Sequence, residues 1–212
     1  MSVISLTNVS KAYQGRPLYT DVTLTIEQGQ THALVGPNGS GKSVMFRLLC
    51  GFLRPDTGTV EINPRYLNSG RTFPDNFGVI IDRPGALAHL SGMDNLRALA
   101  RIRKRISDDD IATTMRSFGL DPEARQRVRN YSLGMKQKLS LCQAFMESPE
   151  VLILDEPFNA LDAESAEALA ARLQAAAEAG TTIVFTSHER EYVDRLADRV
   201  LTIADSRITT AA

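Results

Sequence analysis

The sequence lacks several features that mark whole classes of proteins. Its 212 residues include no tryptophan, only two cysteines and no run approaching the ~18 apolar residues that span a bilayer. Charge of one sign is not in excess either: 24 Lys and Arg face 25 Asp and Glu, so no nucleic-acid partner is expected. With 43% hydrophobic and 23% charged residues, the composition is that of an ordinary globular protein, and it excludes a disordered chain, a collagen-like chain and a disulfide scaffold.

The two cysteines, Cys50 and Cys142, both stand in apolar, helix-like surroundings. Two such thiols do not form the framework of a secreted protein, and the pattern favours a pair of small buried side chains. The first ten residues also lack the basic stretch and apolar run of a signal peptide. We therefore expect a cytoplasmic protein that reaches a membrane only through a partner.

The predicted elements are strands toward both ends of the chain and helices in the middle. A length of 212 residues suits one domain with a substantial core. Because strands and helices alternate in the last third, a parallel sheet with helical crossovers is predicted, and the fold class is α/β. Strands are predicted at 3–6, 22–26, 31–35, 59–62, 77–81, 151–154, 182–185 and 200–203, and helices at 42–51, 93–105, 108–118, 163–179 and 189–196.

Two of these helices carry sequence signals for their ends. Ser107 precedes three aspartates, so it is expected to cap a helix whose first turn is acidic. Asp162 is the expected N-cap of the alanine-rich helix at 163–179, and Gly180 is expected to end that helix.

A glycine-rich loop lies between a predicted strand and a predicted helix, which is the context that gives a phosphate-binding motif its meaning. The loop fits the pattern G-x-x-x-x-G-K-[ST] and consists of Gly36, Pro37, Asn38, Gly39, Ser40, Gly41, Lys42 and Ser43. Glycines let such a loop curl until its N–H groups face phosphate oxygens, and the helix N-terminus adds positive potential there. We predict that Lys42 neutralises the β- and γ-phosphates and that the Ser43 hydroxyl ligates Mg²⁺.

Two acidic residues follow the apolar strand at 151–154, at the edge of an open α/β sheet where ligands collect. Asp155 is predicted to hold Mg²⁺, directly or through water. Glu156 is predicted to face the γ-phosphate and to polarise the attacking water. The alternative for Glu156 is that it only caps a helix after Pro157.

A histidine, His188, follows the next predicted strand, at 182–185. A lone histidine is usually structural, but this position at a strand end can reach a γ-phosphate, and we predict a catalytic role. The other two histidines, His32 inside a strand and His89 in a loop, are not expected to be catalytic.

These motifs together resemble the ATP-binding cassette (ABC) ATPases over nearly the whole chain. The Tyr-Ser-Leu-Gly-Met sequence at 131–135 is similar to the LSGGQ signature of that family. The Asn-Ala-Leu-Asp sequence at 159–162 resembles the D-loop, His188 the switch histidine, and Tyr13 the aromatic residue that stacks on adenine. The signature separates this family from other P-loop proteins such as kinases and small GTPases.

The resemblance implies a particular architecture within a single ABC-type ATPase domain. Residues 1–83 and 147–212 would form a P-loop NTPase core with a mainly parallel sheet and an N-terminal antiparallel β subdomain. Residues 84–146 would form an inserted α-helical subdomain that touches membrane subunits.

The resemblance also implies a mechanism and partners. Two cassettes, identical or different, pair head to tail, and each ATP lies between the P-loop of one subunit and the signature of the other. Ser132 and Gly134 would contact that nucleotide, because the helix that opens there presents free N–H groups. ATP and Mg²⁺ are the implied cofactors, and closing and opening of the dimer would drive an integral-membrane permease subunit. The chain is thus expected on the cytoplasmic face of the membrane.

The sequence departs from the family pattern in two places. Asp82 stands where the family normally has a Gln that ligates Mg²⁺. We predict that Asp82 is a metal ligand. The alternative is that Asp82 only pairs with a nearby Arg. In the signature, Leu133 and Met135 replace Gly and Gln. Both features resemble the branch for bacitracin or lantibiotic resistance and drug export.

We therefore expect the ATP-hydrolysing subunit of an exporter of antibiotic peptides or drugs. The short stretch after the last predicted strand leaves no room for the regulatory domain of some importers, which favours export. The alternative is a non-transport ABC ATPase acting as a nucleotide-gated regulatory module, although the chain lacks the second cassette, coiled-coil insertion or basic extension typical of such proteins. A small-molecule kinase is a third class, which the signature and Glu156 disfavour.

Overall fold

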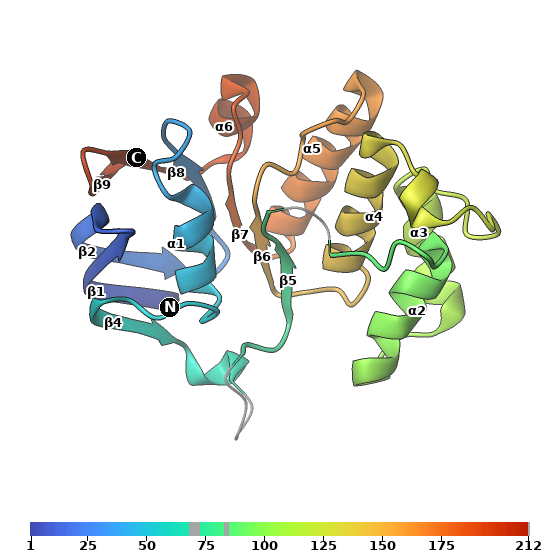
Figure 1. The fold of residues 1–212 in the computed structure, drawn as a ribbon, viewed down its shortest axis with the longest axis horizontal. Helices are drawn as coiled ribbons and strands as arrows, with labels where there is room; N and C mark the ends of the chain where they lie inside the picture. The colour runs from blue at the N-terminus through green and yellow to red at the C-terminus, as the bar shows by residue number, and fades with distance from the viewer. Residues whose placement is uncertain (68–72, 83–84, 212) are drawn as a thin grey trace.

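Two β-sheets and several helices form the part of the chain that the structure describes, residues 1–67, 73–82 and 85–211 of a computed structural model (Figure 1). The smaller sheet is antiparallel and has the strand order β2-β1-β4. It consists of β1 (Ser2–Tyr13), β2 (Arg16–Glu27) and β4 (Thr57–Ile62). Ile4 of β1 lies opposite both Ile26 of β2 and Ile62 of β4, so apolar side chains of all three strands gather on one face.

The larger sheet has six strands in the order β5-β6-β7-β3-β8-β9. They are β3 (Thr31–Val35), β5 (Phe77–Ile80), β6 (Val151–Leu154), β7 (Thr182–Phe185), β8 (Arg199–Ala204) and β9 (Arg207–Ala211). Neighbouring strands are parallel except β8 and β9, which are antiparallel. Since β3, β6 and β7 run parallel, their carboxyl ends meet at one edge, where a ligand site can form.

Helices cover both faces of the larger sheet, and each face has its own core. α1 (Lys42–Leu49) lies between the two sheets, and its buried Phe46 packs with side chains of both. α5 (Ala163–Glu178) and α6 (Arg190–Leu196) pack against the opposite face. Asp162 caps α5 as predicted, because its side chain accepts a hydrogen bond from the Ser165 N–H at 2.8 Å.

A third core joins the helices in the middle of the chain, at the right of Figure 1. These are α2 (Gly92–Arg103), α3 (Asp108–Ser117) and α4 (Leu133–Phe145), with the short 3₁₀ helix η2 (Val128–Asn130) before α4. Leu139 and Cys142 of α4 pack against α2 and α3, whereas Leu141 of the same helix belongs to the core of the larger sheet. α4 therefore connects the helical segment to the sheet. The predicted start of this segment, at 84, lies outside the described residues.

The predicted α/β fold class is confirmed, and so is the burial of Cys50 and Cys142. Ser107 also caps α3 as predicted, in a reciprocal capping box with Asp110. Strand lengths were less well predicted: β1 continues to Tyr13, and β9 was missed. Both segments are polar, and pairing with a neighbouring strand rather than an apolar pattern makes them strands. No helix in the described ranges is long and apolar enough to cross a membrane.

Candidate functional site

The glycine-rich loop connects β3 to α1 in a conformation that requires glycine at two positions. Gly39 and Gly41 have φ angles of 79° and 99°, which side-chain-bearing residues rarely adopt. Gly41 is the N-cap of α1, and it has no side chain to cap the helix. The first turn of α1 also contains no acidic residue. Its first N–H groups are thus available to an anion, as the motif predicts.

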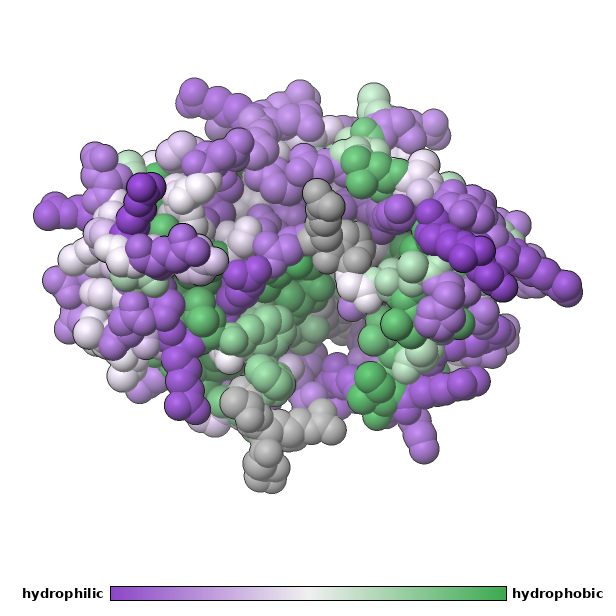
Figure 2. Space-filling model, viewed as in Figure 1, coloured by the Kyte–Doolittle hydropathy of each residue, from purple (hydrophilic) through white to green (hydrophobic). Residues whose placement is uncertain are grey.

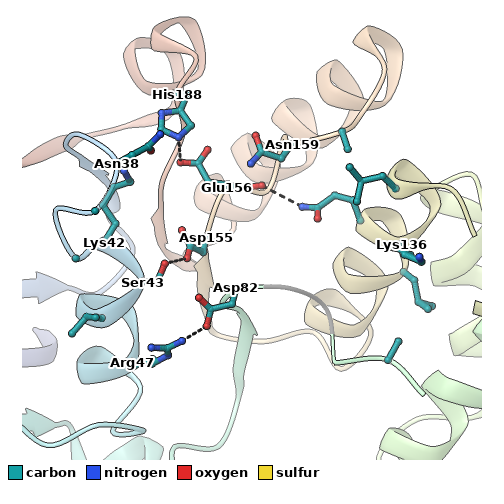
Figure 3. Close-up of a pocket in the computed structure, with 18 of the residues that line it drawn as sticks. Asn38, Lys42, Ser43, Arg47, Asp82, Lys136, Asp155, Glu156, Asn159 and His188 are labelled. Atoms are coloured by element: carbon teal, nitrogen blue, oxygen red, sulfur yellow. Dashed lines mark hydrogen bonds and ion pairs between the residues drawn. The ribbon is translucent and has the colours of Figure 1, made fainter. Parts of the chain in front are cut away.

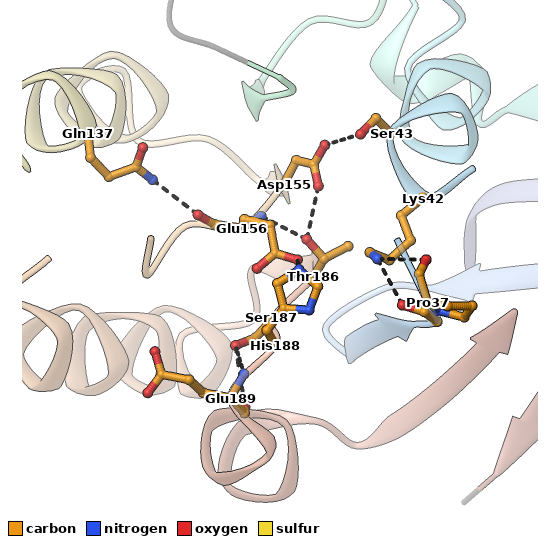
Figure 4. Close-up of polar contacts among 11 residues, drawn as sticks. Pro37, Lys42, Ser43, Gln137, Asp155, Glu156, Thr186, Ser187, His188 and Glu189 are labelled. Atoms are coloured by element: carbon orange, nitrogen blue, oxygen red, sulfur yellow. Dashed lines mark hydrogen bonds and ion pairs between the residues drawn. The ribbon is translucent and has the colours of Figure 1, made fainter. Parts of the chain in front are cut away.

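The ammonium group of Lys42 lies inside this loop (Figure 4). Its Nζ donates hydrogen bonds to the carbonyl oxygens of Gly36 at 2.9 Å and Pro37 at 3.3 Å. The hydroxyl of Ser40 is buried and has no hydrogen-bond partner among the described residues. A loop that holds an ammonium group and leaves a hydroxyl free to donate suits a phosphate group well.

A chain of hydrogen bonds links α1 to the ends of β6 and β7 (Figure 4). The Ser43 hydroxyl donates to Asp155 Oδ2 at 2.5 Å, and the Thr186 hydroxyl donates to Asp155 Oδ1 at 3.0 Å. The same Thr186 oxygen accepts the backbone N–H of Glu156 at 2.7 Å. Thr186 therefore fixes both acidic residues. The sequence prediction missed it, although a hydroxyl directly after a buried strand was the available signal.

The carboxylate of Glu156 faces the side chain of His188, next to the ends of the neighbouring strands β6 and β7 (Figure 3). His188 Nε2 lies 3.2 Å from Glu156 Oε1, and the glutamate side chain is only 18% exposed. Burial is the main cause that raises the pKa of Glu156 above its usual range, while the positive charges of His188 and Lys42 act in the opposite direction. A raised pKa gives the carboxylate a greater affinity for a proton, which suits a general base.

The backbone at Glu156 is held in an unusual conformation by a residue of α4. Glu156 has a φ of 49°, in the left-handed region. Gln137 Nε2 donates hydrogen bonds to the carbonyl oxygens of Glu156 at 3.3 Å and Pro157 at 2.9 Å. Gln137, which the sequence prediction also missed, thus connects the helical segment to the turn that carries the acidic pair. After Pro157, the next helix in the described part of the chain is α5, which begins at Ala163. The alternative that Glu156 serves only as a helix cap is therefore disfavoured.

These residues line a cleft of about 1030 Å³ whose walls come from both halves of the chain (Figure 3). The predicted site residues that line it are Tyr13, Asn38, Gly39, Gly41, Lys42, Ser43, Asp82, Asp155, Glu156 and His188. Of the other predicted residues, Gly36, Pro37 and Ser40 complete the glycine-rich loop, and Ser132 and Gly134 stand at the start of α4. Three basic residues that were not predicted also line the wall: Arg47, Arg129 and Lys136.

Tyr13 stands at the end of β1, on the rim of this cleft. Tyr13 is 62% exposed, so its side chain is accessible to a ligand. An exposed aromatic ring beside a phosphate-binding loop is the arrangement that stacking on a base requires. The contact with adenine stays a prediction.

The signature sequence forms the N-terminus of α4. Ser132 is the N-cap, and its hydroxyl accepts a hydrogen bond from the Met135 N–H at 3.1 Å. Leu133 is 73% exposed. Gly134 packs closely, because a Cβ added there would come within 2.7 Å of the carbonyl oxygen of Ala160. A contact of Ser132 and Gly134 with a nucleotide stays a prediction that concerns a second subunit.

Asp82 forms an ion pair with Arg47 of α1 (Figure 3). This is the alternative stated above for Asp82. The residue has a φ of 59° and also lines the cleft that contains Asp155. Arg47 offsets the negative charge of the carboxylate in this arrangement.

The residues present fit a magnesium ion only together with a phosphate ligand. Among the described residues, no group of three or more His, Cys, Asp and Glu side chains can hold a metal ion. The Ser43 hydroxyl and the Asp155 carboxylate offer oxygen ligands 2.5 Å apart. Mg²⁺ prefers oxygen ligands and keeps several of its waters, with phosphates completing the shell. The pair therefore suits Mg²⁺ bound with a nucleotide.

Comparison with known proteins agrees with this geometry. The ABC transporter family model matches residues 19–159, and the chain belongs to the family of ABC transporter ATP-binding proteins. The uncharacterized ABC transporter ATP-binding protein YybJ of Bacillus subtilis is 34% identical and is covered over 96% of its length, with 99% of this chain aligned. The lantibiotic transport ATP-binding protein SrtF of Streptococcus pyogenes is 31% identical, with 97% of this chain and 89% of SrtF aligned. The bacitracin transport ATP-binding protein BcrA of Enterococcus faecalis is 34% identical over 92% of this chain, which spans 64% of BcrA.

Solved structures show the same fold. The ATP-binding subunit of an ABC transporter superimposes with a TM-score of 0.86 and 26% identity, covering 100% of this chain and 90% of its own. The dimeric cassette MJ0796 in a post-hydrolysis state with ADP and Pi gives a TM-score of 0.87 at 21% identity, covering 98% and 97%. The predicted P-loop NTPase architecture is thereby confirmed.

Proposed function

We propose that the protein is the ATP-hydrolysing subunit of an ABC exporter. The observation that carries this proposal is the position of the Glu156 carboxylate, 3.2 Å from His188 Nε2, in the same cleft as the phosphate-binding loop. A loop alone would support only nucleotide binding. The buried acid beside it supplies a group that can take a proton from water.

The residues around the phosphate-binding loop and the acidic pair have distinct roles in this proposal. The loop amides and Lys42 bind the β- and γ-phosphates and neutralise their charge. Glu156 orients the attacking water and accepts its proton, and the cost of burying the carboxylate makes that transfer more favourable. His188 lies at the same point and contacts the γ-phosphate, while Thr186 keeps the acidic pair in place.

Ser43 and Asp155 are the proposed ligands of Mg²⁺, and Asp82 is a further candidate. When bound, the ion supplies positive charge that offsets the negative charge of the phosphate oxygens. Ser43 and Asp155 already lie in contact, so little rearrangement is needed at those two positions. Asp82 pairs with Arg47, which competes with a metal ion for its carboxylate.

A second cassette completes the proposed site. Ser132 and the free N–H groups at the start of α4 form an anion-binding helix end, and in a head-to-tail dimer they would cover the nucleotide of the other subunit. Exposure of Leu133 is consistent with a surface that a partner covers.

A membrane permease is the proposed partner that receives the motion, and it would hold this chain on the cytoplasmic face of the membrane. A groove of about 520 Å³ lies between the region after α1, the end of β5 and helix α4. Its lining residues include Phe52, Val79, Ile81 and Gln143. Figure 2 shows apolar surface in the hollow at the centre of this face, where β5 lies in Figure 1. Phe52 is 49% exposed, so an apolar segment of a partner can cover it.

Export of an antibiotic peptide or another hydrophobic compound is the proposed task. It is supported by the resemblance to BcrA and SrtF, which are named for bacitracin and lantibiotic transport. The substrate itself is expected to be selected mainly by the membrane partner.

The Glu156→Gln variant tests the enzymatic part of the proposal. Removing the base is expected to lower ATP turnover by at least about 100-fold, because general-base catalysis contributes about 10² to 10⁴. ATP affinity is expected to persist, since the phosphate loop is unchanged. Phosphate release and ATP binding by calorimetry measure the two effects separately, and Glu123→Gln at an exposed site is the matched control. Normal turnover in Glu156→Gln would show that the base lies elsewhere.

A further inference from the structure

One tyrosine hydroxyl reaches the phosphate loop from the antiparallel sheet, and neither the motifs nor the proposed function accounts for it. Tyr19 lies in β2 and is only 1% exposed, packed in the core between the two sheets. Its hydroxyl donates a hydrogen bond to the carbonyl oxygen of Gly41. Gly41 is the N-cap of α1 and the residue before Lys42.

The ring of Tyr19 and the backbone of Gly41 are in close contact as well. A Cβ added to Gly41 would lie 2.5 Å from the Tyr19 hydroxyl oxygen and 3.0 Å from the ring carbon that carries it. The position thus requires glycine for two reasons: its φ of 99° and the space that the tyrosine occupies. Burial raises the pKa of Tyr19, so the hydroxyl stays protonated and remains a donor.

The acceptor of this bond belongs to a peptide group that matters for phosphate binding. The Gly41 carbonyl and the Lys42 N–H share one planar trans peptide, in which C=O and N–H point in opposite directions. The carbonyl accepts bonds from the Tyr19 hydroxyl and from the Met45 N–H, the latter at 2.9 Å. Both donors lie on the protein side of that peptide. Since Tyr19 and Met45 are both buried, the Lys42 N–H on the opposite side of the peptide points away from these two core residues.

The helix does not orient this peptide strongly by other means. Gly41 caps α1 without a side-chain hydrogen bond, and a left-handed glycine has more rotational freedom than any other residue. The Met45 bond is a single bond in the first turn of the helix, which is the turn most prone to fray. The Tyr19 hydroxyl is a second donor, and it comes from the antiparallel sheet. It restricts a rotation of the Gly41–Lys42 peptide that the helix alone leaves open.

We propose that Tyr19 is a positioning residue of the nucleotide site, whose hydroxyl fixes the Gly41–Lys42 peptide so that the Lys42 N–H faces a bound phosphate. This inference rests on the proposed binding of ATP by the loop. It adds a second residue of the antiparallel sheet to the site, beside Tyr13 of β1. The hydroxyl orients the loop before a ligand binds, so its loss affects affinity more than chemistry.

The Tyr19→Phe variant tests the proposal, because it removes the hydroxyl and keeps the buried ring. The dissociation constants for ADP and ATP are expected to rise about 3- to 10-fold, the range set by one hydrogen bond. The KM for ATP is expected to rise with them, while kcat at saturating ATP stays within about twofold. Tyr66→Phe is the matched control, since Tyr66 is also buried, at 3% exposure, and packs against Phe77 outside the loop.

Calorimetric titration with ADP and thermal unfolding with and without ADP distinguish the outcomes. The proposal predicts that ADP raises the melting temperature less in Tyr19→Phe than in Tyr66→Phe and the unaltered protein. Equal ADP affinity in all three proteins would overturn it. So would a melting temperature that falls by the same amount with and without ADP, which is the signature of a purely structural role. Failure of the unaltered protein to bind ADP or ATP would instead refute the proposed function.

Discussion

His32 is buried in β3, in the middle of the parallel sheet, and we expect acid to destabilise the protein through this residue. The side chain is 0% exposed, and neither ring nitrogen has a hydrogen-bond partner among the described residues. Burial is the main cause that lowers its pKa from 6.5 to about 4. The fold therefore holds His32 in its neutral form.

The charged groups around His32 only partly offset one another. Arg199 of β8 lowers the pKa further, whereas Asp198 and Glu27 raise it. The gap between 6.5 and about 4 corresponds to at most about 3.5 kcal/mol, at ~1.4 kcal/mol for each pH unit. We expect about half of this value, because a protonated site admits water and relaxes.

The direction of the effect follows from which state binds the proton first. Well above pH 6.5, His32 is neutral in both the folded and the unfolded protein, and its contribution is fully present. As the pH falls below 6.5, the unfolded chain takes up a proton that the folded chain refuses, so the free energy of unfolding decreases. The decrease stops near pH 4, where the folded state is protonated too.

Urea unfolding at two pH values measures this effect. Between about pH 7.5 and pH 5, we expect His32 to account for about 1 kcal/mol of lost stability, with an upper limit of about 2. His32→Leu removes the titrating group, so its stability should fall less over this interval than that of the unaltered protein. His89→Gln is the control, because His89 is exposed. If His32→Leu and the unaltered protein lose the same free energy, the buried neutral histidine is not the cause.

Two glycine substitutions test the contacts of α4. Gly78→Ala places a Cβ 2.1 Å from the carbonyl oxygen of Ala144, so we expect a loss of about 3 kcal/mol in urea unfolding; wild-type stability would refute this tight packing. Gly134→Ala should not give the gain of up to ~1 kcal/mol that alanine brings to a helix, because its Cβ meets Ala160 at 2.7 Å. Urea unfolding and ATP turnover of Gly134→Ala measure the effect of this contact. Gly85→Ala is the control, because a Cβ there meets open space. A Gly134→Ala protein more stable than the unaltered protein would contradict the prediction.

Local motifs were predictable from the sequence because their chemistry acts between near neighbours. The glycine-rich loop needs positive φ at Gly39 and Gly41 and a helix start after them, and all three are written in consecutive residues. The caps Ser107 and Asp162 act on N–H groups three residues away. Asp155 and Glu156 follow a strand whose burial its own apolar run requires.

Other features depend on residues far apart in the chain, and no local pattern reports them. The ion pair of Asp82 with Arg47 exists because the end of β5 comes to lie beside α1. β9 is a strand only because β8 offers it an edge. Gln137 and Thr186 look like ordinary polar residues until folding brings them to the acidic pair.

The sequence by itself determined the fold class, the phosphate loop and the acidic strand end, since each depends on apolar periodicity or on the backbone freedom of a few adjacent residues. Tertiary structure alone decided which side chains hold those groups in place. Tyr19 shows the reason: its hydroxyl lies 22 positions from Gly41 in the chain, and only the packing of β2 against α1 joins them. Hydrogen bonds of that kind are short in space and distant in sequence, so they can be read only from the folded chain.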